Sequence, residues 1–139
     1  MEPTISRAET ALDGQAILAT LDAVAERHGD PTAAIYVELF SRHPELEKLF
    51  WLDRDGSLRA AMVQQGLECI LDQVGGGRMA ATIIADERSR HVGYGVPAER
   101  FDDFMVAIRD AFRRILGDEW TNEMARAWER LLAEFAAMR

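Results

Sequence analysis

The chain contains three histidines and one cysteine, the side chains best suited to bind a transition metal ion. His28, His43 and His91 are spaced 15 and 48 residues apart, and Cys69 is the only cysteine. A metal site made of side chains alone needs several such ligands at close spacing. The spacing therefore argues against a metal ion with several protein ligands.

His91 is the best candidate for a metal ligand because it ends a short predicted helix directly before a glycine-rich segment, residues 93–97. A ring at a helix end can project into a gap between helices. One imidazole suffices for iron if a porphyrin supplies four more nitrogens. The alternative is an exposed histidine favoured by the negative end of the helix dipole. His28 fits that alternative, and His43 is expected to be structural or exposed.

Signals for helices recur along the chain, and signals for strands do not. Apolar residues at helical spacing are separated by Asp, Pro, Gly, Ser or Thr at positions typical of helix ends. The predicted helices begin near Asp13, Asp30, Pro44, Ser57, Met79, Pro97 and Thr121. We therefore predict an all-α fold of about seven helices, with residues 1–12 as a short N-terminal extension and residues 13–139 as one domain.

The two C-terminal helices show the clearest apolar stripes. The short segment from Gly117 to Trp120 separates them, so we expect them to pair antiparallel. Trp128 lies on the apolar stripe of the last helix and is expected to be buried.

Composition and charge exclude several classes of function. The net charge is -8, which argues against a nucleic-acid partner because phosphate binding depends on clustered Lys and Arg. No apolar run reaches the roughly 20 residues of a membrane-spanning helix. The acidic N-terminus is unlike a secretory signal. Cys69, without a partner for a disulfide, is expected to be a buried core residue in a cytoplasmic protein.

Three segments resemble bacterial single-domain globins and the globin part of flavohaemoglobins. Residues 36–50 (YVELFSRHPELEKLF) are similar to the second and third helices of these proteins, residues 90–97 (RHVGYGVP) to their proximal segment, and Ala127-Trp128 to their final helix. The resemblance covers residues 13–138. It implies a globin fold enclosing haem b, iron protoporphyrin IX. It further implies reversible binding of O2, with NO and CO as other ligands, for oxygen storage, delivery or sensing.

On the proximal side, the resemblance implies that His91 ligates the iron. Its other ring nitrogen is then expected to donate to the carbonyl oxygen of Glu87, one helical turn earlier. Val96 and Phe101 match apolar positions that line this side, although core filling is an equal alternative. Phe101 stands where flavohaemoglobins often have a tyrosine, and its lack of a hydroxyl makes peroxidase-like or efficient dioxygenase chemistry less expected.

On the distal side, the resemblance implies that Phe50 packs against the haem face and that the Tyr36 hydroxyl donates to bound O2. The alternative for Tyr36 is a hydrogen bond to a backbone carbonyl. The usual polar distal position falls on Leu58, with Met62 one turn later, or on Arg59 if the register slips by one residue. We favour Leu58 and Met62, because an unpaired arginine buried beside haem is costly.

Two other functions remain compatible with the sequence. The chain is an NO dioxygenase if a reductase supplies electrons, and that reductase is expected to be a separate protein. Alternatively, the chain is a regulatory domain that has the globin fold, binds no haem and acts by dimerisation. No catalytic residue is assigned, and both a monomer and a homodimer are compatible with the sequence.

Overall fold

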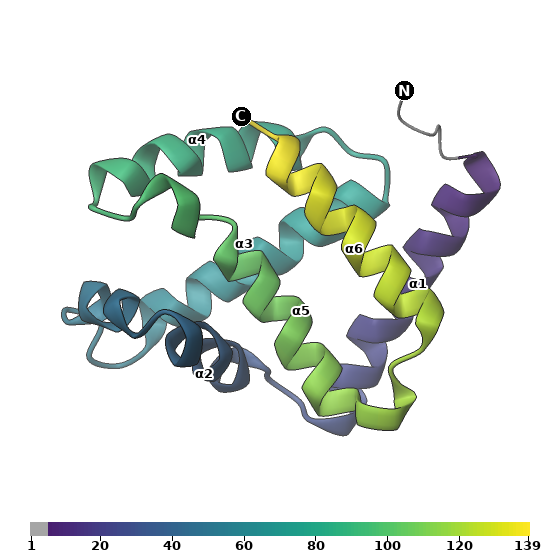
Figure 1. The fold of residues 1–139 in the computed structure, drawn as a ribbon, viewed down its shortest axis with the longest axis horizontal. Coiled ribbons are helices and arrows are strands. Elements are labelled where there is room, and N and C mark those ends of the chain that lie inside the picture. Colours follow the sequence, from purple (N-terminus) through teal and green to yellow (C-terminus); the bar gives the residue numbers. More distant parts are fainter. Residues whose placement is uncertain (1–5) are drawn as a thin grey trace.

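Helices joined by short connections make up the fold (Figure 1), and the structure, a computed structural model, describes residues 6–139. Within these residues there are six α-helices, three short 3-10 helices and no strand. The α-helices are α1 (Arg7–Arg27), α2 (Thr32–Arg42), α3 (Ser57–Val74), α4 (Met79–Gly93), α5 (Asp103–Leu116) and α6 (Asn122–Ala137). The 3-10 helices are η1 (Pro44–Phe50), η2 (Ala98–Arg100) and η3 (Gly117–Glu119). The predicted all-α class is confirmed.

The first helix begins earlier than predicted. Its N-cap is Ser6, whose hydroxyl accepts a hydrogen bond from the backbone N–H of Glu9 at 3.1 Å. The predicted cap at Asp13 is wrong, because Asp13 lies inside α1 and accepts a hydrogen bond from Arg130 of α6 at 3.1 Å. Ser6 satisfies a free amide of the first turn, and no helix breaker follows it before residue 13. Residues 1–5 of the predicted N-terminal extension lie outside the described residues.

Two other helices begin close to the predicted residues: α6 has the predicted N-cap Thr121, whereas the N-cap of α2 is Pro31, one residue after the predicted Asp30. The Asp30 carboxylate accepts hydrogen bonds from the backbone N–H and the hydroxyl of Thr32, at 2.9 Å and 2.6 Å. The Thr121 hydroxyl accepts a bond from the backbone N–H of Met124 at 3.0 Å. Each side chain satisfies an amide that the helix itself leaves free.

The cap of α3 is not the residue that the sequence predicts. Ser57 is the first helical residue, and the N-cap is Gly56, whose φ of +79° favours glycine. The Asp53 carboxylate accepts the backbone N–H groups of Leu58 and Arg59, each at 3.0 Å. A carboxylate from the preceding turn therefore replaces the predicted Ser57 cap.

The long helix predicted to begin at Pro97 is interrupted. Residues Ala98–Arg100 form η2, and α5 begins only at Asp103. In the turn between them, the Asp102 carboxylate accepts two hydrogen bonds from Arg88 of α4. This tertiary contact favours a turn where the apolar pattern alone predicts a continuous helix.

The most extensive helix contacts are between α1 and α6, between α2 and α5, and between α3 and α4 (Figure 1). The sequence predicted that α6 pairs mainly with α5, and this prediction is wrong, because α6 packs mainly against α1. Phe112 and Trp128 still join α5 and α6 by an edge-to-face contact, with ring centroids 5.6 Å apart. Trp128 is fully buried, as predicted. Its indole N–H donates to the Thr20 hydroxyl of α1 at 3.1 Å.

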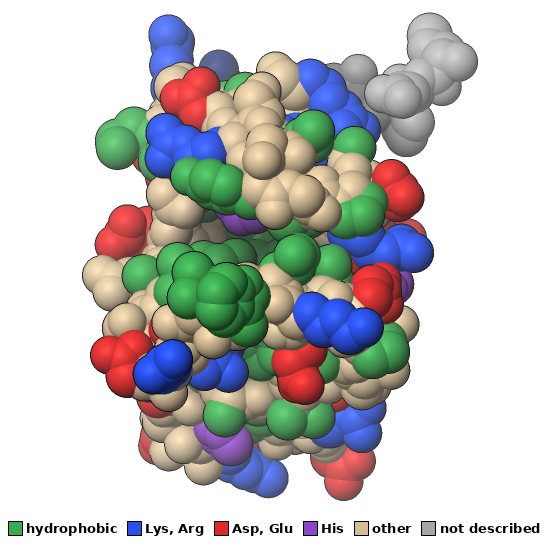
Figure 2. All heavy atoms as spheres, turned by 90° about the vertical axis from the view of Figure 1, so that its left-hand side faces the viewer, with side chains coloured by type: hydrophobic (Ala, Val, Ile, Leu, Met, Phe, Trp, Pro, Cys, Tyr) green, Lys and Arg blue, Asp and Glu red, His purple; other side chains and the backbone are tan. Residues whose placement is uncertain are grey.

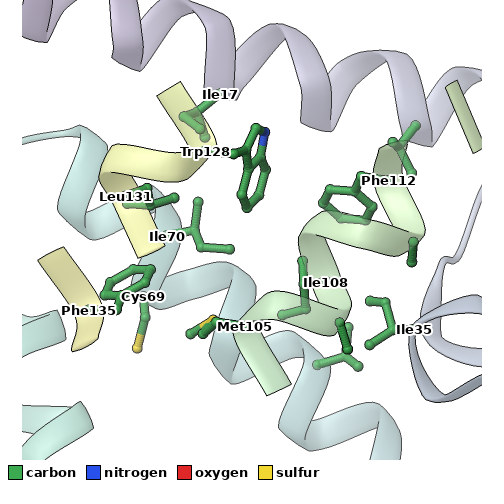
Figure 3. Packing of buried hydrophobic residues seen from close by; sticks show 14 of the residues in the cluster. Ile17, Ile35, Cys69, Ile70, Met105, Ile108, Phe112, Trp128, Leu131 and Phe135 are labelled. Atoms are coloured by element: carbon green, nitrogen blue, oxygen red, sulfur yellow. The ribbon is translucent and has the colours of Figure 1, made fainter. Parts of the chain in front are cut away.

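All six α-helices contribute side chains to the core that contains Trp128. Figure 3 shows Ile17 of α1, Ile70 of α3 and Phe112 of α5 turned toward the same interior region. Gly66 allows α3 to approach α5 closely. A Cβ at this position would lie 3.3 Å from both Phe104 and Ile108. The core thus fixes the spacing between the helices that also border the main cavity.

Candidate functional site

A cavity of about 690 Å³ lies between η1, α3, α4 and the segment leading into α5. Its volume is within the range of about 300–1,000 Å³ typical of small-molecule and cofactor sites. Figure 2 shows a hollow crossing one face of the molecule, with hydrophobic side chains gathered in it and along its border. The predicted site residues on its wall are Phe50, Leu58, Met62, His91, Val96 and Phe101. The fold therefore brings together residues that are up to 51 positions apart, Phe50 and Phe101.

His91 lies near the C-terminal end of α4 and borders the cavity. Its Nδ1 is 2.7 Å from the carbonyl oxygen of Glu87, the acceptor that the sequence predicts. An Nδ1–H that donates to a carbonyl leaves Nε2 with a free lone pair. The helix thus provides one imidazole nitrogen, Nε2, able to ligate a metal.

The third helix presents an apolar face to the cavity. Leu58 and Met62 belong to the cavity wall. Arg59 does not, and its guanidinium donates to the carboxylate of Asp53 at 2.9 Å. Leu58 and Met62 therefore face the cavity while Arg59 points to Asp53. Because Arg59 is paired there, this arrangement leaves no unpaired arginine beside the cavity.

The Asp53 carboxylate holds this register from the turn before α3. Burial would by itself raise the pKa of Asp53, but the hydrogen bonds from the amides of Leu58 and Arg59 and from the Arg59 guanidinium outweigh burial and lower it. Asp53 is therefore charged near neutral pH and stabilises the start of the helix that carries Leu58.

Tyr36 is the predicted site residue that does not line the cavity. It is 5% exposed, and its ring packs against Phe50 and Phe104, with centroids at 5.5 Å and 6.0 Å. Its hydroxyl donates to the carbonyl oxygen of Arg59 at 3.2 Å. Desolvation raises the pKa of Tyr36 well above its usual value. The phenol is therefore a neutral donor that lies behind the cavity wall. Its hydrogen bond to a backbone carbonyl is the alternative that the sequence analysis gave to donation to O2.

The two remaining histidines lie elsewhere. His28 is the exposed C-cap residue of α1. His43 caps the end of α2, where its Nε2 is 3.2 Å from a carboxylate oxygen of Asp103. Neither borders the cavity, which agrees with their interpretation as exposed or structural residues.

The cavity wall includes polar residues that the sequence reasoning missed. These are Gln65, Arg90 and Arg100. Glu87, which was predicted only as the carbonyl acceptor for His91, also borders the cavity. Gln65 could have been found, because it follows Leu58 by seven residues and so lies on the same helical face. Arg100 had no comparable signal, because it belongs to the unpredicted turn η2.

The donor set fits a haem better than a bare metal ion. Among residues 6–139, no group of three or more His, Cys, Asp or Glu is arranged to hold a metal ion. Haem iron needs only one imidazole from the protein, and His91 provides it on a largely apolar wall. Burial raises the pKa of the Cys69 thiol, which also borders the cavity, so this thiol stays protonated and binds metal weakly.

The described helices include none that combines the length and the apolar character needed to cross a membrane.

No curated protein shows a significant match to the chain. The family model described as Globin matches residues 33–138. The matched region runs from α2 to the end of α6 and contains every residue of the cavity wall. It agrees with the all-α architecture. The chain belongs to the globin family, whose members typically bind haem.

Proposed function

We propose that the chain holds haem b through His91 and reversibly binds a diatomic gas at its iron, O2 in the first place and NO or CO as other ligands. One observation supports this most strongly. His91, with Nδ1 bonded to the Glu87 carbonyl, lies on the wall of a largely apolar cavity of about 690 Å³. When haem is bound, its iron is the atom that binds the gas. Storage, delivery or sensing of oxygen is the corresponding role.

The chain's own residues would hold the porphyrin and exclude water from it. Phe50, Leu58 and Met62 border one part of the cavity, and Val96 and Phe101 another. Apolar side chains on both sides suit a flat, mostly apolar macrocycle. They also lower the local dielectric, which strengthens any hydrogen bond to a polar ligand inside.

We also propose Tyr36 as the hydrogen-bond donor to O2. Its hydroxyl has one proton, which in the described structure goes to the Arg59 carbonyl oxygen. The gas ligand and the backbone carbonyl therefore compete for this proton. A hydrogen bond to a partly charged acceptor is worth about 1.5–3 kcal/mol and a neutral one about 0.5–1.5 kcal/mol. The net stabilisation of O2 is the difference, on the order of 1 kcal/mol.

The finer assignment to the bacterial single-domain globins depends on the segments from Tyr36 to Phe50 and from Arg90 to Pro97. These segments supply the second helix, the η1 corner and the turn after His91. Both segments contribute residues to the cavity wall. A cytoplasmic location and a separate reductase belong to the same proposal.

Absorption spectroscopy of the purified chain tests the function. We expect a Soret band after haem reconstitution, a ferrous spectrum that changes on adding O2 or CO, and reversal when the gas is removed. A chain that takes up no haem would contradict the proposal and favour a haem-free regulatory domain. Catalytic consumption of NO with an added electron donor would instead identify an NO dioxygenase.

A further inference from the structure

Arg88 is a buried cation one turn before His91, and the proposed function assigns it no role. It is only 9% exposed, and arginines are rarely buried unless they are paired. Its guanidinium donates two hydrogen bonds to the Asp102 carboxylate, at 2.6 Å and 3.1 Å. It also donates to the carbonyl oxygens of Phe135 at 2.8 Å and Met138 at 2.6 Å. Arg88 therefore joins α4 to the start of α5 and to the end of α6.

The same guanidinium also lies over the ring of Phe101, 4.7 Å from its centroid. The Phe101 ring in turn meets the ring of His91 edge to face, with centroids 5.3 Å apart and an interplanar angle of 76°. Both arrangements are attractive, the first between a cation and an aromatic face and the second between two aromatic rings. Phe101 thus contacts both Arg88 and His91.

The His91 ring has two internal restraints that act on different features. The hydrogen bond to the Glu87 carbonyl, at 2.7 Å, fixes the position of Nδ1. The contact with Phe101 restricts the plane of the ring. Tyr94 also approaches the ring, but it is 70% exposed and its centroid is farther away, at 6.3 Å. Phe101, which is partly buried and closer, is therefore the stronger restraint on the ring plane.

We propose that Arg88 is a positioning residue for His91. Through Phe101 it fixes the plane of the imidazole that faces the iron, and through the carbonyls of Phe135 and Met138 it links that plane to the end of α6. The inference depends on the proposed function, because it needs His91 to ligate haem iron. A merely structural ion pair would stabilise the fold without affecting the iron–histidine bond.

The test compares haem-loaded variants of the full chain by two measurements. One is the iron–histidine stretching band of the ferrous protein in resonance Raman spectra, and the other is the rate of haem transfer to an acceptor apoprotein. We expect Arg88→Met to shift or broaden the band and to speed haem loss by about tenfold or more, the range typical of residues that support a metal-ligating histidine. Arg88→Lys keeps the charge near Phe101 and Asp102 and should give an intermediate band.

Arg42→Met is the matched control. Arg42 pairs with the buried carboxylate of Asp110 at 2.6 Å and joins α2 to α5, but it does not border the cavity. This variant should lower the midpoint of thermal unfolding and leave the Raman band unchanged. The comparison separates general destabilisation from an effect on His91.

Folded Arg88→Met with the wild-type band and the wild-type rate of haem loss would overturn the proposal. If Arg88→Met does not fold, Arg88→Lys decides, because it keeps the charge and leaves Phe101 in place but removes the planar guanidinium that lies over the Phe101 ring. A shifted band then supports the positioning role, and an unchanged band refutes it. A wild-type chain that takes up no haem refutes the proposed function together with this inference. Haem-loaded wild type with unaffected variants refutes only the role of Arg88.

Discussion

The Tyr36 hydroxyl donates to the carbonyl oxygen of Arg59 across 3.2 Å and so ties α2 to the first turn of α3. This bond joins the residue proposed as the donor to O2 with the backbone of the helix that carries Leu58 and Met62. Any interaction of Tyr36 with a gas ligand must therefore exceed this bond in strength.

Replacement of Tyr36 by phenylalanine should speed O2 dissociation by roughly tenfold, since a net hydrogen-bond energy of about 1.4 kcal/mol corresponds to a factor of ten. The CO dissociation rate should change far less, because bound CO carries little partial charge. Stopped-flow measurement of both rates checks this. Equal changes for the two gases would indicate altered packing, and unchanged rates would restrict Tyr36 to its contact with Arg59.

Replacement of His91 by alanine should abolish tight haem retention, because the described cavity offers no second imidazole. Added imidazole should restore part of the haem spectrum by occupying the vacated space. His28→Ala is the control, since His28 is exposed and does not border the cavity. Full haem content with an unchanged ferrous spectrum in His91→Ala would show that another residue ligates the iron.

Replacement of Trp128 by alanine should lower the free energy of unfolding by about 3–5 kcal/mol, because it leaves a large cavity among α1, α5 and α6. It also removes the donor to the Thr20 hydroxyl. Trp51→Ala is the matched control, because Trp51 is 73% exposed and should change the free energy by less than about 0.5 kcal/mol. Denaturant titration of both variants measures the difference. Similar small losses in the two variants would contradict the central place of Trp128 in the core.

Replacement of Asp53 by asparagine should destabilise the chain in a pH-dependent way. The pKa of Asp53 is lowered in the folded state, so its charge contributes stability above the unfolded pKa of about 3.9. That contribution is lost as the pH falls through the folded pKa. The difference in unfolding free energy between wild type and Asp53→Asn should therefore be constant from about pH 6 to 8 and shrink below about pH 4.

Asp118→Asn provides the comparison, because Asp118 is exposed in η3, away from the cavity. It should show little destabilisation at any of these pH values. A difference for Asp53→Asn that persists unchanged into acid would mean that packing of the side chain, and not its charge, stabilises the start of α3.

Local patterns in the sequence predicted the features that depend on residues within one or two helical turns. The all-α class follows from apolar residues at helical spacing, which recur without reference to distant parts of the chain. The resemblance implied the contact between His91 and the Glu87 carbonyl, and helix geometry allows it, because a residue four positions earlier lies one turn away. The assignment of Leu58 and Met62 to the site came from the resemblance, and their spacing of four residues places them on one helical face.

Contacts between distant segments decided the rest. The Tyr36 hydroxyl meets an acceptor 23 residues away, and Arg88 meets carbonyl oxygens 47 and 50 residues away. The sequence shows that these side chains can donate, but the crossing and register of the packed helices determine which acceptors lie within reach. The interruption before α5 has the same origin, because the pairing of Arg88 with Asp102 favours a turn where local apolar periodicity favours a helix.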